Sequence, residues 1–160
     1  MIVEITDNQS RPVDQALLAA AARAAQELGA ASLPGTPRPL DEISIVLLDD
    51  EAMTALNRQL LGRDDATDVI AFEAEDDPDA RRSEIYVNTD AAARQGPEYG
   101  HDFAWELCFL VAHGLLHALG YADATDTDRR RMFSLQHAVL AGLGLGDEGD
   151  TGIGRRSDTS

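Results

Sequence analysis

The chain contains no lysine, and arginine supplies all thirteen of its basic residues. This absence excludes a lysine Schiff base and the lysine of a phosphate-binding P-loop. Acidic residues outnumber basic residues 29 to 13, which gives a formal net charge of −16 at neutral pH. Such a charge opposes non-specific binding to nucleic acid or to an anionic membrane. Any contact with nucleic acid must therefore be made at a local site, against the field of the whole protein.

Cysteine is almost absent, since Cys108 is the single cysteine of the chain. An internal disulfide is therefore impossible, no disulfide-linked partner is expected, and a reducing compartment is predicted. The longest apolar run, residues 109–120, is too short for a membrane helix, which needs about 20 residues. Residues 1–5 lack the basic and apolar regions of a signal peptide. We therefore predict a cytoplasmic protein without a membrane-spanning segment.

The length of 160 residues and the mass of 17.2 kDa allow one compact domain, and 44% hydrophobic residues suffice for its core. We place that single domain at residues 1–145. The remaining residues, 146–160, are glycine-rich, polar and acidic and almost lack apolar side chains, so a disordered tail is predicted.

Hydrophobic periodicity and capping residues predict strands and helices in a mixed order. Four strands are expected at residues 2–6, 42–48, 69–72 and 84–87, and the last two form a hairpin. Five helices are expected at about residues 15–28, 50–61, 89–96, 102–119 and 126–142, the first of them ending before Gly29. The predicted fold class is therefore α+β, with a small mixed sheet packed against helices and the apolar fourth helix in the core.

The residues most informative about function are two histidines four positions apart, His113 and His117. On a helix this spacing places both side chains on one face, where they can share a metal ion. Gly120 stands where the helix is expected to stop, and Asp123 follows three residues later, which is the spacing of a zinc-binding helix with a third ligand after a glycine turn. A histidine pair alone is more often a packing or surface feature. The glycine, the acid and the apolar neighbours favour a metal site formed by His113, His117 and Asp123.

Gly114 lies inside the predicted helix, where glycine costs about 1 kcal/mol relative to alanine. A specific requirement for glycine is therefore expected at this position. Helical zinc proteases carry a water-activating glutamate directly after the first histidine. Because Gly114 has no side chain, peptide hydrolysis by that mechanism is not expected.

These residues, taken together, resemble a known family. The segment H-G-L-L-H-A-L-G-Y at residues 113–121 is similar to the motif H-G-x-L-H-x-x-G-Y-D-H of the YbeY family, bacterial metal-dependent endoribonucleases of ribosomal RNA maturation. Residues 56–72 resemble that family's L-N-x-x-Y-R-G-K-D-x-P-T-[DN]-V-L-S-F, residues 83–85 its L-G-D-I strand, and residues 132–136 its last helix. The resemblance implies a single-strand-acting endoribonuclease in rRNA maturation and ribosome quality control. It also implies precursor rRNA and the ribosome or its associated proteins as partners.

Two departures from the family pattern concern the site. The family's third ligand is usually histidine, and the aligned residue here is Asp123. The family's cleft arginine is replaced by Leu61, so Arg63 is our candidate for the catalytic cation, with Arg58 second. A solvated loop charge paired with a neighbouring aspartate explains Arg63 equally well. The departure at Leu61 keeps open a ribosome-assembly factor whose metal is structural and whose catalysis is weak or lost.

The expected cofactor is one divalent ion, with zinc first and manganese as the alternative. Two imidazoles and one carboxylate leave an open fourth position, which is typical of catalytic zinc. An oxygen ligand in place of a third imidazole shifts preference toward harder ions such as manganese. The other two histidines, His101 and His137, have no partner at ligand spacing and are expected at the surface.

Overall fold

The computed structural model describes residues 1–32, 39–74 and 79–145, so the tail predicted at residues 146–160 lies outside the described residues. The strands are β1 (Ile2–Asn8), β2 (Glu42–Leu48), β3 (Val69–Ala74) and β4 (Arg82–Asn88). The helices are α1 (Gln15–Ser32), α2 (Asp50–Leu61), α3 (Thr89–Glu98), α4 (Phe103–Leu119) and α5 (Asp126–Gly142).

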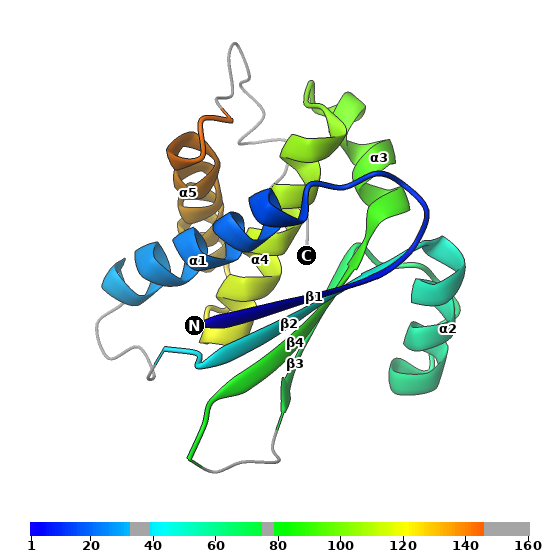
Figure 1. Ribbon diagram of the computed structural model, residues 1–160, viewed down its shortest axis with the longest axis horizontal. Helices are drawn as coiled ribbons and strands as arrows, with labels where there is room; N and C mark the ends of the chain where they lie inside the picture. Colours follow the sequence, from blue (N-terminus) through cyan, green and yellow to red (C-terminus); the bar gives the residue numbers. More distant parts are fainter. Residues whose placement is uncertain (33–38, 75–78, 146–160) are drawn as a thin grey trace.

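The strands form one mixed sheet in the order β1-β2-β4-β3. β2 pairs in parallel with both β1 and β4, whereas β3 and β4 form the predicted antiparallel hairpin. Helices α1, α4 and α5 lie on one side of this sheet, and α2 lies apart from them beside the strands (Figure 1). The predicted α+β fold with a mixed sheet is therefore confirmed, and β3 is an edge strand.

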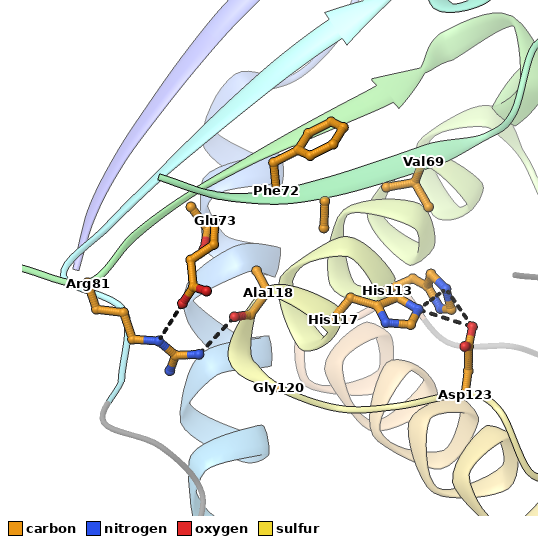
Figure 2. Close-up of a pocket in the computed structure, with 11 residues that line it drawn as sticks. Val69, Phe72, Glu73, Arg81, His113, His117, Ala118, Gly120 and Asp123 are labelled. Atoms are coloured by element: carbon orange, nitrogen blue, oxygen red, sulfur yellow. Dashed lines mark hydrogen bonds and ion pairs between the residues drawn. The ribbon is translucent and has the colours of Figure 1, made fainter. Parts of the chain in front are cut away.

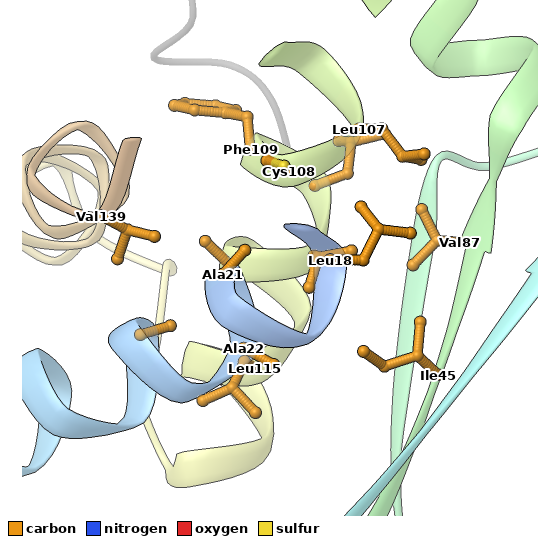
Figure 3. Packing of buried hydrophobic residues seen from close by; sticks show 14 of the residues in the cluster. Leu18, Ala21, Ala22, Ile45, Val87, Leu107, Cys108, Phe109, Leu115 and Val139 are labelled. Carbon is orange, nitrogen blue, oxygen red and sulfur yellow. The ribbon is translucent and has the colours of Figure 1, made fainter. Parts of the chain in front are cut away.

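Helix α4 is the centre of the core. It is apolar almost all round its circumference, so it must pack on every side: it contacts β3, β4, α1, α3 and α5. Figure 3 shows Leu18 of α1 and Leu107 of α4 turned toward Ile45 and Val87 on the strands. Because this burial fixes the rotation of α4, it also fixes which way the histidines at its C-terminal end point.

No single helix among the described residues is both long and apolar enough to cross a membrane. The pair α3 and α4 reaches that length and composition only together, and the chain bends by 116° between them.

Helix α1 does not end before Gly29, as the sequence predicts, but continues to Ser32. A Cβ atom at Gly29 would lie 2.8 Å from Leu119 Cδ2 and 2.9 Å from Leu116 Cδ2. The Tyr121 hydroxyl also donates a 2.6 Å hydrogen bond to the Gly29 carbonyl oxygen. Glycine at this position permits a close crossing of α1 and α4. The sequence prediction is wrong because it interprets this glycine as a signal for the end of the helix.

Candidate metal centre

Gly114 brings α4 unusually close to the sheet. A Cβ atom at this position would lie 2.9 Å from Val69 Cγ2 and 3.2 Å from Ile85 Cγ2, closer than packed side chains approach. The requirement for glycine expected from the sequence is therefore a packing requirement. The close approach places the flanking histidines, His113 and His117, next to the edge strand β3. It also leaves no room for a protease glutamate at position 114.

Gly120 ends α4 and turns the chain back. Its φ of 124° is accessible to glycine and rare for other residues, and the amides of Gly120 and Tyr121 both donate to the Leu116 carbonyl, at 3.1 and 2.9 Å. Tyr121 is buried against α1 through its bond to Gly29. The chain then passes Asp123 before Thr125 caps α5. Asp123 is thereby carried back toward the face of α4 that bears the histidines.

The three predicted ligands converge on one point (Figure 2). The Nε2 atoms of His113 and His117 are 3.1 Å apart. Asp123 Oδ2 lies 3.1 Å from His117 Nε2 and 3.9 Å from His113 Nε2. One ligand atom from each residue lies within 4.8 Å of the others, and His113 is buried while the other two residues are partly exposed. The group could hold a metal ion on its solvent-accessible side.

The second ring nitrogen of each histidine faces an oxygen. His113 Nδ1 lies 3.2 Å from Gln136 Oε1, and the same amide donates through Nε2 to the Phe109 carbonyl, which fixes its orientation. His117 Nδ1 lies 3.1 Å from the Tyr121 carbonyl oxygen. Because these oxygens accept, both Nδ1 atoms carry the proton in the neutral rings. Two Nε2 lone pairs and a carboxylate oxygen then face one another. All three are electron-pair donors, so a bound cation would stabilise this arrangement.

Arg129 holds the segment that carries Asp123. Its Nη1 atom donates to the Asp123 carbonyl at 3.1 Å and to the Ala124 carbonyl at 3.4 Å, and its Nη2 pairs with Asp126. Helix α5 thus contributes two supports to the site, Gln136 behind His113 and Arg129 behind Asp123. The sequence does not assign either residue to the site: the resemblance of residues 132–136 to the family's last helix includes Gln136 but gives it no role, and the four-residue spacing of the histidines gives no information about α5.

A cleft of about 540 Å³ opens at the three residues. It runs between the edge strand β3 and the C-terminal end of α4, and Figure 2 shows Arg81 and Glu73 on the other side of Ala118 from the histidines. The remaining lining residues are small or apolar: Val69, Ala71, Phe72, Ser83, Ala118 and Gly120. The cleft therefore has a cluster of metal-ligand type at one end and a charged pair at the other.

The predicted catalytic cation, Arg63, is exposed and is not among the described residues that line this cleft. Arg58 is also exposed, and its Nε atom pairs with Asp64 Oδ1 at 2.5 Å. Leu61, which stands where the family has arginine, leaves 53% of its surface exposed. The arginine that does line the cleft is Arg81, which sequence reasoning missed because it precedes β4 and lies outside every motif.

His101 and His137 are not surface residues, contrary to the expectation from the sequence. His101 is buried and stacks on Trp105, with ring centroids 3.5 Å apart and planes 4° apart. His137 is partly buried and stacks on Phe133 at 4.6 Å. The expectation failed because it considered ligand spacing and not the aromatic residues one helical turn away.

Fold and cleft define a small α+β domain with a three-residue cluster of metal-ligand type. The family model described as "Endoribonuclease YbeY" matches residues 4–144. The chain belongs to the YbeY endoribonuclease family, as the sequence motifs predict.

Two relatives illustrate this membership, and one solved structure shares the fold. "Endoribonuclease YbeY" of Symbiobacterium thermophilum is 37% identical over 153 residues, which cover 90% of this chain and 92% of that protein. "Endoribonuclease YbeY" of Moorella thermoacetica is 42% identical over 115 residues, 65% of this chain and 74% of that protein. A solution structure of a Thermotoga maritima protein, 21% identical, has a TM-score of 0.57 over 93% of this chain and 99% of its own, which supports the fold.

Proposed function

We propose that the protein is a metal-dependent endoribonuclease of ribosomal RNA maturation that acts in the cytoplasm, and that residues 1–145 are its catalytic domain. The observation that carries the proposal is the convergence of His113 Nε2, His117 Nε2 and Asp123 Oδ2 within 4.8 Å at one end of a cleft. The names of its relatives agree with this activity.

His113, His117 and Asp123 are the proposed metal ligands. A divalent ion held by them would polarise a phosphodiester and make a nearby water molecule more acidic. Gln136 and the Tyr121 carbonyl keep the two imidazoles in the tautomer that presents Nε2 to the ion. Three protein ligands beside a cleft are typical of a catalytic site, whereas structural zinc sites are usually closed by four.

Zinc is the proposed ion, and manganese is the alternative that the Asp123 oxygen favours. Asp123→His would replace this oxygen by the softer imidazole of the family's usual site. We expect Asp123→His to raise the preference for zinc over manganese, as measured by competition between the two ions for metal-free protein. If Asp123→Ala retains the wild-type affinity, a neighbouring acid such as Asp126 supplies the third ligand instead.

The alternative function is a ribosome-assembly factor with a structural metal and little catalysis. Leu61 favours it, because the family's cleft arginine is missing at this position. Cleavage of a single-stranded rRNA fragment, measured with zinc, with manganese and with a chelator, separates the two functions. Chelator-sensitive cleavage that His117→Ala abolishes supports the nuclease. Stoichiometric metal without any such cleavage contradicts the nuclease and favours the assembly factor.

A further inference from the structure

We infer that Arg81 is the phosphate-binding residue of the cleft and that Glu73 competes with the RNA backbone for it. The inference rests on the proposed function, since it assigns to Arg81 a phosphate of the single-stranded RNA whose cleavage is proposed at the ion. Arg81 then supplies the cation that sequence reasoning assigns to Arg63.

Arg81 is held firmly at the cleft wall. Its Nη2 atom donates to the carbonyl oxygens of Ala118 and Leu119, at 3.0 Å each, and only 14% of the side chain is exposed. These carbonyls belong to the last turn of α4, directly after His117. The guanidinium is therefore positioned by the same helix end that positions a metal ligand, so the distance between the two is fixed by the fold.

The charge of the cleft makes this position important. Among the described residues that line the cleft, Arg81 is the single cation, and Glu73 and Asp123 are the carboxylates. With neutral histidines, one negative charge remains, and a divalent ion reverses it to one positive charge. In a protein with a net charge of −16, an RNA phosphate needs a local cation in order to bind, and without the ion Arg81 is the only cation among the described lining residues. Removing Arg81 would leave the loaded cleft with no excess positive charge.

Glu73 is the group that a phosphate would displace. Its Oε1 atom lies 3.8 Å from Arg81 Nε, which is too long for a hydrogen bond, and 63% of its side chain is exposed. An ion pair with so exposed a partner contributes little stability. A phosphate offers the guanidinium a shorter, charge-assisted hydrogen bond, and Glu73 can swing into solvent. The present pair therefore weakens RNA binding without preventing it.

The inference predicts opposite effects from the two members of the pair. Arg81→Gln should weaken binding of a fluorescein-labelled single-stranded RNA to metal-free protein about tenfold, because it removes one charge-assisted hydrogen bond to phosphate. It should also reduce the slope of log Kd against log salt by about 0.7, as expected when one phosphate of a single strand is no longer neutralised. Arg81→Lys should retain that slope. Glu73→Gln should tighten binding about threefold, because it removes the competing charge.

A matched control pair, Arg82 and Glu42, lies outside the cleft lining. Arg82 follows Arg81 in the chain, and its Nε atom pairs with Glu42 at 3.2 Å, away from the cleft lining. Arg82→Gln and Glu42→Gln change the net charge of the protein as Arg81→Gln and Glu73→Gln do. We expect both controls to leave the RNA affinity and the salt slope at wild-type values.

The outcomes separate this inference from the proposed function. The inference is supported if every variant keeps its full metal content and only Arg81→Gln and Glu73→Gln alter RNA binding. If wild type cleaves RNA with metal but Arg81→Gln binds and cleaves as well as Arg82→Gln, Arg81 only anchors α4 and the inference is wrong. If Arg81→Gln fails to fold, Glu73→Gln still decides, because unchanged RNA affinity in that variant contradicts the competition. Absence of chelator-sensitive cleavage in wild type contradicts the proposed function, and the binding measurements still test Arg81.

Discussion

Helix α4 carries one stripe of ring-bearing residues at four-residue spacing, and its two halves differ sharply. Trp105 and Phe109, in the N-terminal half, pack with His101, His137 and Phe133 into an aromatic cluster. His113 and His117, in the C-terminal half, meet at 80° with their Nε2 atoms 3.1 Å apart. All four histidines of the chain therefore lie in this stripe or pack against it, yet His101 and His137 are stacked on aromatic rings, and His113 and His117 are aimed at a common point.

The difference shows that the surroundings of a histidine, and not its residue type alone, decide whether it is placed to serve as a metal ligand. A stacked imidazole is held by its ring face, whereas His113 and His117 are held by Nδ1, which leaves Nε2 directed into the cleft. Gln136 joins the two halves, because it accepts from His113 and donates to the Phe109 carbonyl. The aromatic half thus supports the orientation of the ligand half.

The largest expected effect comes from substituting histidines in each of the two halves. His113→Ala and His117→Ala should each lose nearly all bound metal, since two remaining donors hold a divalent ion weakly. His101→Phe and His137→Phe retain an aromatic ring in the stack and should keep one ion per chain. Metal analysis of the four purified variants tests the comparison. Equal metal content in all four would show that the convergence at His113 and His117 is packing.

The helices and strands, and the convergence of His113, His117 and Asp123, could be predicted from the sequence because they depend on local spacing. The four-residue interval of His113 and His117 and the stop at Gly120 act within a turn or two of helix. The aromatic half could be predicted only in part. His101 and His137 each stack on a residue four positions away, but the contact of His137 with Phe109 depends on how α5 crosses α4.

The cation of the cleft could not be predicted, for the same reason. Arg63 lies within a family motif, whereas Arg81 reaches the cleft because the β3–β4 hairpin carries it to the end of α4. Its hydrogen bond to Ala118 spans 37 residues and belongs to no repeating pattern. Candidate metal ligands that are close in sequence form a recognisable spacing. Cleft residues that come from separate strands and helices form no such spacing.

Breaking the link between the two halves should have the next largest effect. Gln136→Leu removes the acceptor for His113 Nδ1, which frees the ring to rotate and to change tautomer. We expect metal affinity to fall about 10- to 100-fold, as is usual when the outer partner of a metal-bound histidine is removed. Competition with a fluorescent chelator measures this affinity. Ser134→Ala, on the exposed side of the same helix, is the control and should retain wild-type affinity.

A smaller effect is expected where the ligand is held through its backbone. Arg129→Gln removes the bonds from α5 to the Asp123 and Ala124 carbonyls but leaves the ligand atom itself in place. We expect metal affinity to fall about threefold to tenfold, which is less than the value of one charge-assisted hydrogen bond, because these bonds hold the backbone and not the ligand atom. The exposed neighbour Arg130 provides the control variant Arg130→Gln. An effect as large as that of His117→Ala would mean that Arg129 organises the whole segment.

The smallest effect on metal is expected from Cys108, which lies in the N-terminal half of α4 beside Phe109 in sequence and carries a thiol that could in principle be a donor. It is fully buried in the core, and burial above all, with the carboxylates of Asp14 and Asp102, raises the pKa of its thiol from 9.0 to about 12. A neutral thiol there does not act as a ligand, so Cys108→Ala should keep one ion per chain.

The raised pKa of the Cys108 thiol can also be tested through the pH dependence of stability. Above pH 9 the unfolded chain loses the Cys108 proton while the folded chain keeps it until about pH 12, so the free energy of unfolding falls as pH rises through this window. This slope reaches at most about 1.4 kcal/mol per pH unit for one group. Tyr86, whose pKa is also raised to about 12, contributes equally in wild type and Cys108→Ala, so the difference between their slopes isolates the thiol. Urea unfolding of both proteins from pH 8 to 11 measures it, and identical slopes would mean that Cys108 ionises in the folded protein and is accessible as a donor.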